Sequence, residues 1–236
     1  MEAFQAAVDL GYSYLETDLH RTRDGVLVTF HDDTLDRTTN QSGPVADRTW
    51  EELSACDAAH NFSPHEDYPR RGRGVRVPSL EEVFDAFPDI RLVLDLKQSG
   101  FEQDLADFLR RRGLEDQAIV GSFSDRRLRR FRAASGGRVA TSSGPSETVA
   151  LYLASRLGRP LPTRADALQI PEEFAFVKLS DRKLIEAAEA AGRQVHVWTV
   201  NDPDHMAQLL DVGVHALITD RPDILKSLLT ERNQWH

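Results

Sequence analysis

Tyrosine or acidic residues alternate with leucine or threonine in the stretch Tyr14-Leu15-Glu16-Thr17-Asp18-Leu19. With the period of two of a β-strand, Tyr14, Glu16 and Asp18 share one face, and the residues between them share the other. If the second face packs against helices, the two carboxylates lie near the C-terminal end of a strand, where TIM-type barrels place their active sites. A half-buried strand with its polar side in water has the same pattern, so this stretch alone leaves both interpretations open.

A second stretch, Arg91-Leu92-Val93-Leu94-Asp95-Leu96-Lys97, repeats the alternation. Its leucines share one face, and Val93, Asp95 and Lys97 share the other. A buried carboxylate and ammonium are costly unless they are paired or bind a metal, so a single ion pair is one explanation. Together with Glu16 and Asp18, however, Asp95 would complete a group of three carboxylates that repel one another without a cation. Oxygen ligands favour Mg²⁺ or Ca²⁺ over zinc, and Lys97 would lie beside the metal, suited to bind a phosphate oxygen.

Further strands and helices are expected to alternate along the rest of the chain. Strands are expected at 91–96, 118–122, 137–141, 166–170, 194–200 and 214–219, and helices at 101–112, 124–134, 146–157, 180–191 and 203–211. Repeated β-then-α units of this spacing predict a parallel sheet with helices outside it.

The region before residue 80 departs from this alternation. A short helix is expected at 2–10, and strands 13–19 and 26–30 are too close for a parallel crossover, so they predict an antiparallel hairpin that turns at Asp24-Gly25. Residues 32–78 are polar and irregular around one expected helix near 49–58, which indicates an insertion or long loop. This segment ends where Ser79 and Glu82 can form a capping box.

The fold class expected from these elements is α/β, a TIM-type (β/α)8 barrel that forms one domain over residues 1–236. The strand at 13–19 raises the number of parallel strands to seven, whereas a barrel has eight, so we expect the first strand to lie upstream of Met1. An open doubly wound sheet is the alternative, but no glycine-rich phosphate loop follows the first strand. Without strand one, exposed edges beside 13–19 and 214–219 would favour a homo-oligomer.

The composition and net charge of the chain disfavour some classes of binding partner. A formal net charge of -9 disfavours nucleic-acid binding, and no apolar stretch is long enough for a membrane span. The lone Cys56 cannot form an internal disulfide, and no signal peptide opens the chain. These features favour a cytoplasmic protein with a small-molecule partner.

Two further side chains are candidates for the site. His31 ends the hairpin strand, where it could pass protons to or from a phosphodiester oxygen, although a lone histidine is more often structural or exposed. His20 has a weaker claim, because it is expected to be loop-borne or exposed. Trp198 lies near the end of an expected strand and either packs in the core or forms a wall of the substrate pocket.

Eight motifs, in this order, resemble the glycerophosphodiester phosphodiesterase family and span nearly the whole chain. They are Glu16-Thr17-Asp18, the Asp24-Gly25 hairpin, Phe30-His31-Asp32, Leu35-Asp36-Arg37-Thr38-Thr39, Pro78-Ser79-Leu80-Glu81-Glu82, Asp95-Leu96-Lys97, Trp198-Thr199-Val200-Asn201 and Thr219-Asp220-Arg221-Pro222. The resemblance implies a barrel of the phospholipase-C-like kind, a divalent cation, and hydrolysis of glycerophosphodiesters to sn-glycerol 3-phosphate and an alcohol, in glycerol and lipid metabolism.

Carried over by position, the resemblance implies roles for five residues. Glu16, Asp18 and Asp95 resemble metal ligands, Lys97 a phosphate or metal-site partner, and His31 one of two acid/base histidines. The family usually has Glu at the position of Asp95, and its His-Arg-Gly strand, which carries the other histidine, has no counterpart here. The alternative function is therefore a catalytically impaired or non-catalytic barrel that binds a phosphodiester or metal.

Overall fold

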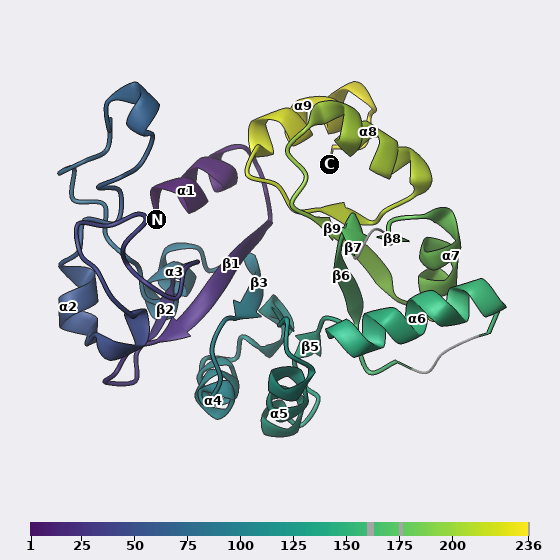
Figure 1. Ribbon diagram of the computed structural model, residues 1–236, viewed down its shortest axis with the longest axis horizontal. Coiled ribbons are helices and arrows are strands. Elements are labelled where there is room, and N and C mark those ends of the chain that lie inside the picture. The colour runs from purple at the N-terminus through teal and green to yellow at the C-terminus, as the bar shows by residue number, and fades with distance from the viewer. Residues whose placement is uncertain (160–162, 175–176, 236) are drawn as a thin grey trace. The chain divides into compact units, whose positions relative to one another are not determined.

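The computed structural model describes residues 1–159, 163–174 and 177–235 (Figure 1). Their contacts divide the chain into two compact units. Unit 1 comprises Met1–Ala118 and Ala133–Gly136, and unit 2 comprises Ile119–Arg132 and Gly137–His236. All but one of the predicted site residues belong to unit 1.

Three strands form the sheet of unit 1. They are β1 (Tyr14–Arg21), β2 (Leu27–Thr29) and β3 (Arg91–Leu96), in the order β2-β1-β3. The β1–β2 pair is antiparallel and the β1–β3 pair is parallel, as predicted. The predicted turn is confirmed, with Gly25 at φ 93°, a left-handed conformation that favours glycine.

Burial follows the predicted alternation on β1 from Tyr14 to Leu19 and, except at Val93, which is also buried, on β3. Leu15, Thr17 and Leu19 of β1 are buried, whereas Glu16 and Asp18 are partly exposed. The leucines of β3 are likewise buried. The apolar face of the sheet is therefore covered, and the carboxylates share the opposite face.

The segment between β2 and β3 has a small hydrophobic core of its own. This cluster consists of Val28, Leu35, Val45, Leu53, Cys56 and Val77. Within it, helix α2 (Trp50–Ser54) is shorter than expected and begins with a capping box of Thr49 and Glu52. The second capping box, predicted from Ser79 and Glu82, is present at the start of α3 (Leu80–Ala86). The cluster packs one end of the segment onto the hairpin, since Val28 belongs to β2.

The remaining elements of unit 1 surround this sheet. They are α1 (Glu2–Asp9), α4 (Glu102–Arg112) and the 3-10 helices Val45–Asp47, Pro64–Glu66 and Glu115–Gln117. Phe4 of α1 packs edge-to-face on Phe87, with ring centroids 6.5 Å apart. The short N-terminal helix is thus tied to the turn that leads into β3.

Unit 2 contains further parallel strands and the helices that follow them. Its strands are β4 (Ala118–Gly121), β5 (Ala140–Thr141), β6 (Ala167–Pro171), β9 (Gln194–Trp198) and β10 (Ala216–Leu217), and its helices are α5 (Asp125–Ser135), α6 (Pro145–Leu157), α7 (Arg182–Ala190), α8 (Pro203–Val212) and α9 (Pro222–Glu231). The first residue of β4 and the last three of α5 are assigned to unit 1. β4 pairs with β5, and β9 lies between β6 and β10, all in parallel. The β-then-α alternation is confirmed at every predicted position.

Some boundaries in unit 2 differ from the predicted ones. Strand β5 starts at Ala140 rather than 137, because Gly136 and Gly137 adopt positive φ in the turn after α5. A short antiparallel hairpin, β7 (Glu173–Phe174) with β8 (Val177–Lys178), was not predicted. Across the described residues, no helix is long and apolar enough to cross a membrane.

Candidate active site

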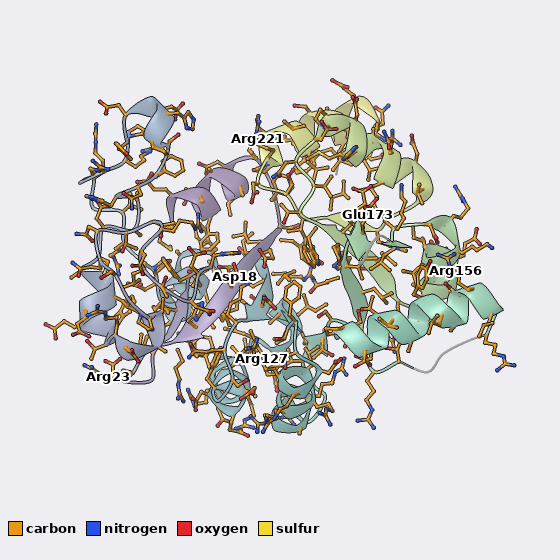
Figure 2. The ribbon with its side chains drawn as sticks, in the orientation of Figure 1. Asp18, Arg23, Arg127, Arg156, Glu173 and Arg221 are labelled. Atoms are coloured by element: carbon orange, nitrogen blue, oxygen red, sulfur yellow. The ribbon has the colours of Figure 1, made fainter. Side chains whose placement is uncertain are left out.

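The centre of the candidate site is a cluster of Asp18, Asp95 and Lys97 near the C-terminal end of the parallel ladder between β1 and β3. The parallel ladder pairs Asp18 directly with Asp95, so their side chains lie on the same face. Nζ of Lys97 lies 2.9 Å from Oδ1 of Asp18 and 3.2 Å from Oδ2 of Asp95. Figure 2 shows Asp18 on β1. The structure therefore brings these three of the predicted site residues together.

Because this cluster is mostly buried, the attraction between the ammonium group and the two carboxylates is stronger than it would be in water. The side chains of Asp18, Asp95 and Lys97 are only 15%, 14% and 22% exposed. Burial by itself lowers the pKa of Lys97, but the hydrogen bonds to and charges of the two aspartates outweigh it and raise that pKa overall. The ammonium group therefore stays charged over the whole physiological pH range and offsets the repulsion between the carboxylates.

Glu16 lies two residues before Asp18 on the same face of β1, opposite Val93 of β3. Among the described residues, no group of three or more His, Cys, Asp and Glu side chains is arranged to hold a metal ion. The donor chemistry nevertheless fits a hard divalent cation, because Asp18 and Asp95 present carboxylate oxygens side by side. Glu16, Asp18, Asp95 and Lys97 carry a formal charge of −2 together, which a dication would balance.

His31 is held at the end of the hairpin by its neighbours. The backbone N–H of Phe30 donates to the carbonyl oxygen of Asp18 over 3.0 Å, which places His31 just beyond the carboxylate cluster along the hairpin. The ring is 68% exposed, and its Nδ1 lies 2.6 Å from Oδ1 of Asp32. Arg37 donates two hydrogen bonds to the same carboxylate, 2.6 and 2.9 Å long.

These contacts determine which ring nitrogen of His31 is available. Hydrogen bonds from Arg37 lower the pKa of Asp32 to about 2, and the contact with His31 lowers it further, against the effect of burial. Because the ionised carboxylate can only accept, Nδ1 of His31 must donate, and Nε2 is left to exchange protons with a ligand. The orienting roles of Asp32 and Arg37 were missed by sequence analysis, although both lie in motifs singled out there.

Trp198 belongs to unit 2, where it ends β9. Its ring packs edge-to-face against Phe123, with centroids 5.2 Å apart and planes inclined at 73°. Phe123 follows β4 and is 64% exposed. Such a pair offers a large apolar surface to a ligand. Phe123 was missed by sequence analysis, and its position just after a parallel strand was the signal available.

The motifs around Asn201 and Asp220 join two loops of unit 2. Nδ2 of Asn201 donates to Oδ2 of Asp220 over 2.9 Å. Its Oδ1 accepts from the Thr219 hydroxyl and the Asp220 backbone N–H, at 3.0 and 2.9 Å. The loop after β9 is thereby fastened to the loop after β10, which gives these motifs a structural role.

The expectation for His20 was wrong. His20 lies on β1 and is 1% exposed, rather than loop-borne or at the surface. Its Nδ1 lies 3.2 Å from Oε1 of Gln98. The polar neighbours Arg21 and Arg23 obscured the strand continuation, which becomes apparent only through pairing with β2.

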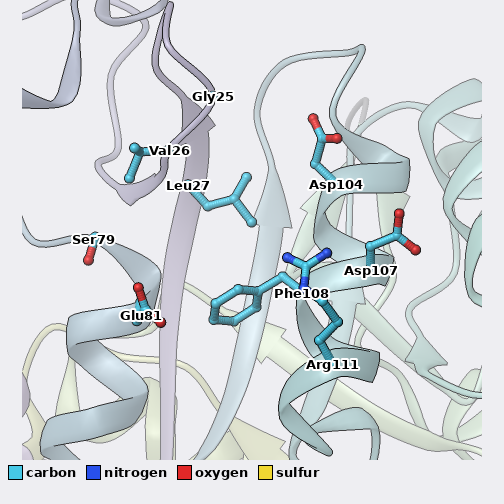
Figure 3. A pocket seen from close by; sticks show the side chains of 9 residues that line it. All are labelled: Gly25, Val26, Leu27, Ser79, Glu81, Asp104, Asp107, Phe108 and Arg111. Atoms are coloured by element: carbon cyan, nitrogen blue, oxygen red, sulfur yellow. The ribbon is translucent and has the colours of Figure 1, made fainter.

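A separate pocket of about 300 Å³ lies elsewhere in unit 1 (Figure 3). It opens between the hairpin turn and helices α3 and α4, and its lining consists of Gly25, Val26, Leu27, Ser79, Glu81, Asp104, Asp107, Phe108 and Arg111. Its carboxylates form ion pairs with arginines. None of the predicted site residues lines it.

Comparison with known proteins identifies the family. Residues 1–224 match the glycerophosphoryl diester phosphodiesterase family. The chain is 35% identical to the "Probable glycerophosphodiester phosphodiesterase 2" of Mycobacterium tuberculosis over all of its own length and 86% of that protein. It is 29% identical to a glycerophosphodiester phosphodiesterase of Caldanaerobacter subterraneus, covering 96% of this chain and 90% of the relative.

Solved structures identify the fold. A glycerophosphodiester phosphodiesterase from Agrobacterium tumefaciens superimposes with a TM-score of 0.76 at 23% identity, over 94% of this chain and 90% of that one. An Oleispira antarctica phosphodiesterase in complex with sn-glycerol-3-phosphate gives 0.72 at 23% identity, over 97% and 89%. The predicted TIM-barrel-like α/β fold is therefore confirmed, and the chain belongs to the glycerophosphoryl diester phosphodiesterase family.

Proposed function

We propose that this protein hydrolyses glycerophosphodiesters to sn-glycerol 3-phosphate and an alcohol. The observation that carries the proposal is the cluster of Asp18, Asp95 and Lys97 near the C-terminal end of the ladder between two parallel strands, in a chain that belongs to this family. The named activities of its relatives and the product bound to the Oleispira antarctica enzyme support the choice of substrate.

Glu16, Asp18 and Asp95 are the proposed ligands of one divalent cation, Mg²⁺ or Ca²⁺. Two of them already lie in register on neighbouring strands, and the family is generally dependent on a divalent metal. When bound, such a cation polarises phosphoryl oxygens and lowers the pKa of an attacking hydroxyl or water. Asp95 is one methylene shorter than the family's usual Glu, so we expect weaker cation affinity than in relatives with Glu.

Lys97 is the proposed contact for the substrate phosphate. Its ammonium group is charged, and only 22% of its side chain is exposed. A phosphate oxygen placed near Nζ would replace part of the interaction that Asp18 and Asp95 now provide. In partly buried surroundings such a charge-assisted hydrogen bond is stronger than in water.

His31 is the proposed proton-transfer group. In the reaction a new oxygen–phosphorus bond forms and the bond from phosphorus to the alcohol oxygen breaks, so the attacking oxygen loses a proton and the leaving oxygen gains one. Nε2 of His31 is suited to one of these transfers, because Asp32 engages Nδ1. Trp198, together with Phe123, is proposed to contact the substrate through its apolar surface.

The test is release of sn-glycerol 3-phosphate from glycerophosphocholine with Mg²⁺ or Ca²⁺, for the wild type and for Glu16→Gln, Asp18→Asn and Asp95→Asn. We expect wild-type turnover that stops with a chelator, and a loss of at least about 100-fold in each variant. Asp89→Asn, an exposed carboxylate before β3, is the matched control. Full turnover in Glu16→Gln would overturn the ligand assignment.

The same protein samples distinguish the non-catalytic alternative. Calorimetric binding of glycerophosphocholine in the presence of the cation, without any product over hours, would favour a barrel that binds the phosphodiester without hydrolysing it. Release of product by the wild type would exclude that alternative.

A further inference from the structure

His20 occupies an unusual position in β1. The side chain of the next residue, Arg21, points to the helix-covered side of the sheet, where it pairs with Asp104 of α4 at 2.6 Å. His20 therefore points to the opposite side, the one that carries Asp18. It lies directly across from Val28 of β2, which belongs to the hydrophobic cluster of the 32–78 segment. The imidazole is thus enclosed between that cluster and the carboxylate site.

Gln98 determines the role of each nitrogen of His20. Its Nε2 donates to the carbonyl oxygen of Arg21 over 3.1 Å, so its Oε1 is the atom that faces His20. Since an amide oxygen can only accept, Nδ1 of His20 is the donor of the 3.2 Å hydrogen bond. A single glutamine side chain is thereby attached to two consecutive residues of β1.

Gln98 directly follows Lys97, so this attachment constrains the lysine. The backbone N–H of Lys97 donates to the carbonyl oxygen of Leu19 over 3.2 Å, which places Lys97 beside His20 on the neighbouring strand. β3 ends at Leu96, and the chain beyond Lys97 has no regular ladder to hold it. The His20–Gln98 hydrogen bond is therefore a tie between the end of β1 and the chain just after Lys97.

The other nitrogen of His20 argues against simple core packing. Its Nε2 is buried and has no hydrogen-bond partner among the residues that the structure describes. A buried acceptor of this kind is costly, so an apolar side chain would serve packing alone better than histidine does. What histidine supplies at this position is the Nδ1–H donor to Gln98.

We propose that His20 and Gln98 form a clamp that positions the ammonium group of Lys97 between Asp18 and Asp95. His20 is a positioning residue, which acts through Gln98 and the backbone on Lys97 and does not touch the substrate. The effect on turnover rests on the proposed function, whereas the effect on the place of Lys97 does not.

Substitutions at His20 separate this role from a structural one. Nδ2 of an asparagine lies near the position of the imidazole Nδ1, whereas the amide of a glutamine extends toward the position of Nε2. We therefore expect His20→Asn to preserve the hydrogen bond to Gln98 and His20→Gln to lose it. Gln98→Leu removes the amide oxygen that accepts the hydrogen bond from His20. The control is His65→Gln, at an exposed histidine.

The experiment compares kcat and KM for glycerophosphocholine, and crystal structures, across these variants and the wild type. We expect His20→Gln and Gln98→Leu to lower kcat/KM about 10- to 100-fold, as small misplacements of a site group do, with Lys97 Nζ displaced from Asp18. His20→Asn should keep kcat/KM within about threefold of wild type. The double variant His20→Gln/Gln98→Leu should be no worse than either single one.

Two results would overturn the clamp. One is a folded His20→Gln or Gln98→Leu variant in which Lys97 stays between the two aspartates. The other is an equal loss of activity in His20→Asn and His20→Gln, which would indicate a packing role. An inactive wild type would instead refute the proposed function, and the position of Lys97 in the crystal structures would still decide the clamp.

Discussion

Asp18 and Asp95 lie directly opposite each other in the parallel ladder between β1 and β3, and both contact the same ammonium group. Two carboxylates in register on one face would repel each other, and the charge of Lys97 is the compensation that this chain provides. Lys97 and the proposed cation would therefore act on the same pair of carboxylates, and removal of the lysine should affect stability and cation binding in opposite directions.

Lys97→Met is expected to destabilise the protein by about 1–3 kcal/mol in chelator, because it leaves two partly buried carboxylates without their shared cation. Mg²⁺ or Ca²⁺ should restore more stability in this variant than in the wild type. Thermal unfolding with and without the cation measures both effects, with the exposed Lys183→Met as the control. If the cation raised the unfolding temperature equally in Lys97→Met and in the wild type, Lys97 and the cation would not act on the same carboxylates.

Asp32→Asn is expected to lower stability at neutral pH and to make it less sensitive to acid. The folded-state pKa of Asp32 is about 2, below the ordinary value of 3.8, so its ionised form stabilises the fold above that ordinary value. This contribution, about 1 kcal/mol after solvent screening, is lost as pH falls through about 4 toward 2. Denaturant unfolding at several pH values should show the wild type and the control Asp33→Asn losing stability together as the pH falls, until both match Asp32→Asn.

Asn201→Ala is expected to destabilise the protein by about 1–2 kcal/mol, because it removes the hydrogen bonds that join the loops after β9 and β10. Denaturant unfolding measures the change. The exposed Gln208→Ala on α8 is the matched control and should change stability by less than about 0.5 kcal/mol. A wild-type unfolding midpoint for Asn201→Ala would show that the network contributes nothing.

Phe123→Ala is expected to raise KM for glycerophosphodiesters about 3- to 30-fold, with little effect on stability, because the ring is exposed and packs on Trp198. Phe62 is 56% exposed in unit 1 and serves as the control. If Phe62→Ala and Phe123→Ala change KM equally, the aromatic pair is no substrate contact.

Local sequence patterns were sufficient for most of the elements. The alternation in β1 and β3 predicted that their leucines are buried, and the pair Ser79 and Glu82 predicted the start of α3, since a capping box depends on four neighbouring residues. The hairpin β7–β8 escaped prediction, because two-residue strands have no periodicity to detect.

The sequence by itself determined that Asp18, Asp95 and Lys97 would lie near the C-terminal ends of parallel strands, because strand period and β-then-α order are properties of neighbouring residues. Tertiary structure alone decided that Lys97 bridges both aspartates, that Asp32 and Arg37 orient His31, and that His20 is enclosed and bonded to Gln98. The His20–Gln98 pair is separated by 78 positions, and only the pairing of β1 with β2 and β3 brings it together. The contacts of Lys97 and of His20 depend on which distant strands pair, and those of His31 depend on the path of the loop after β2. A pattern of neighbouring residues specifies neither.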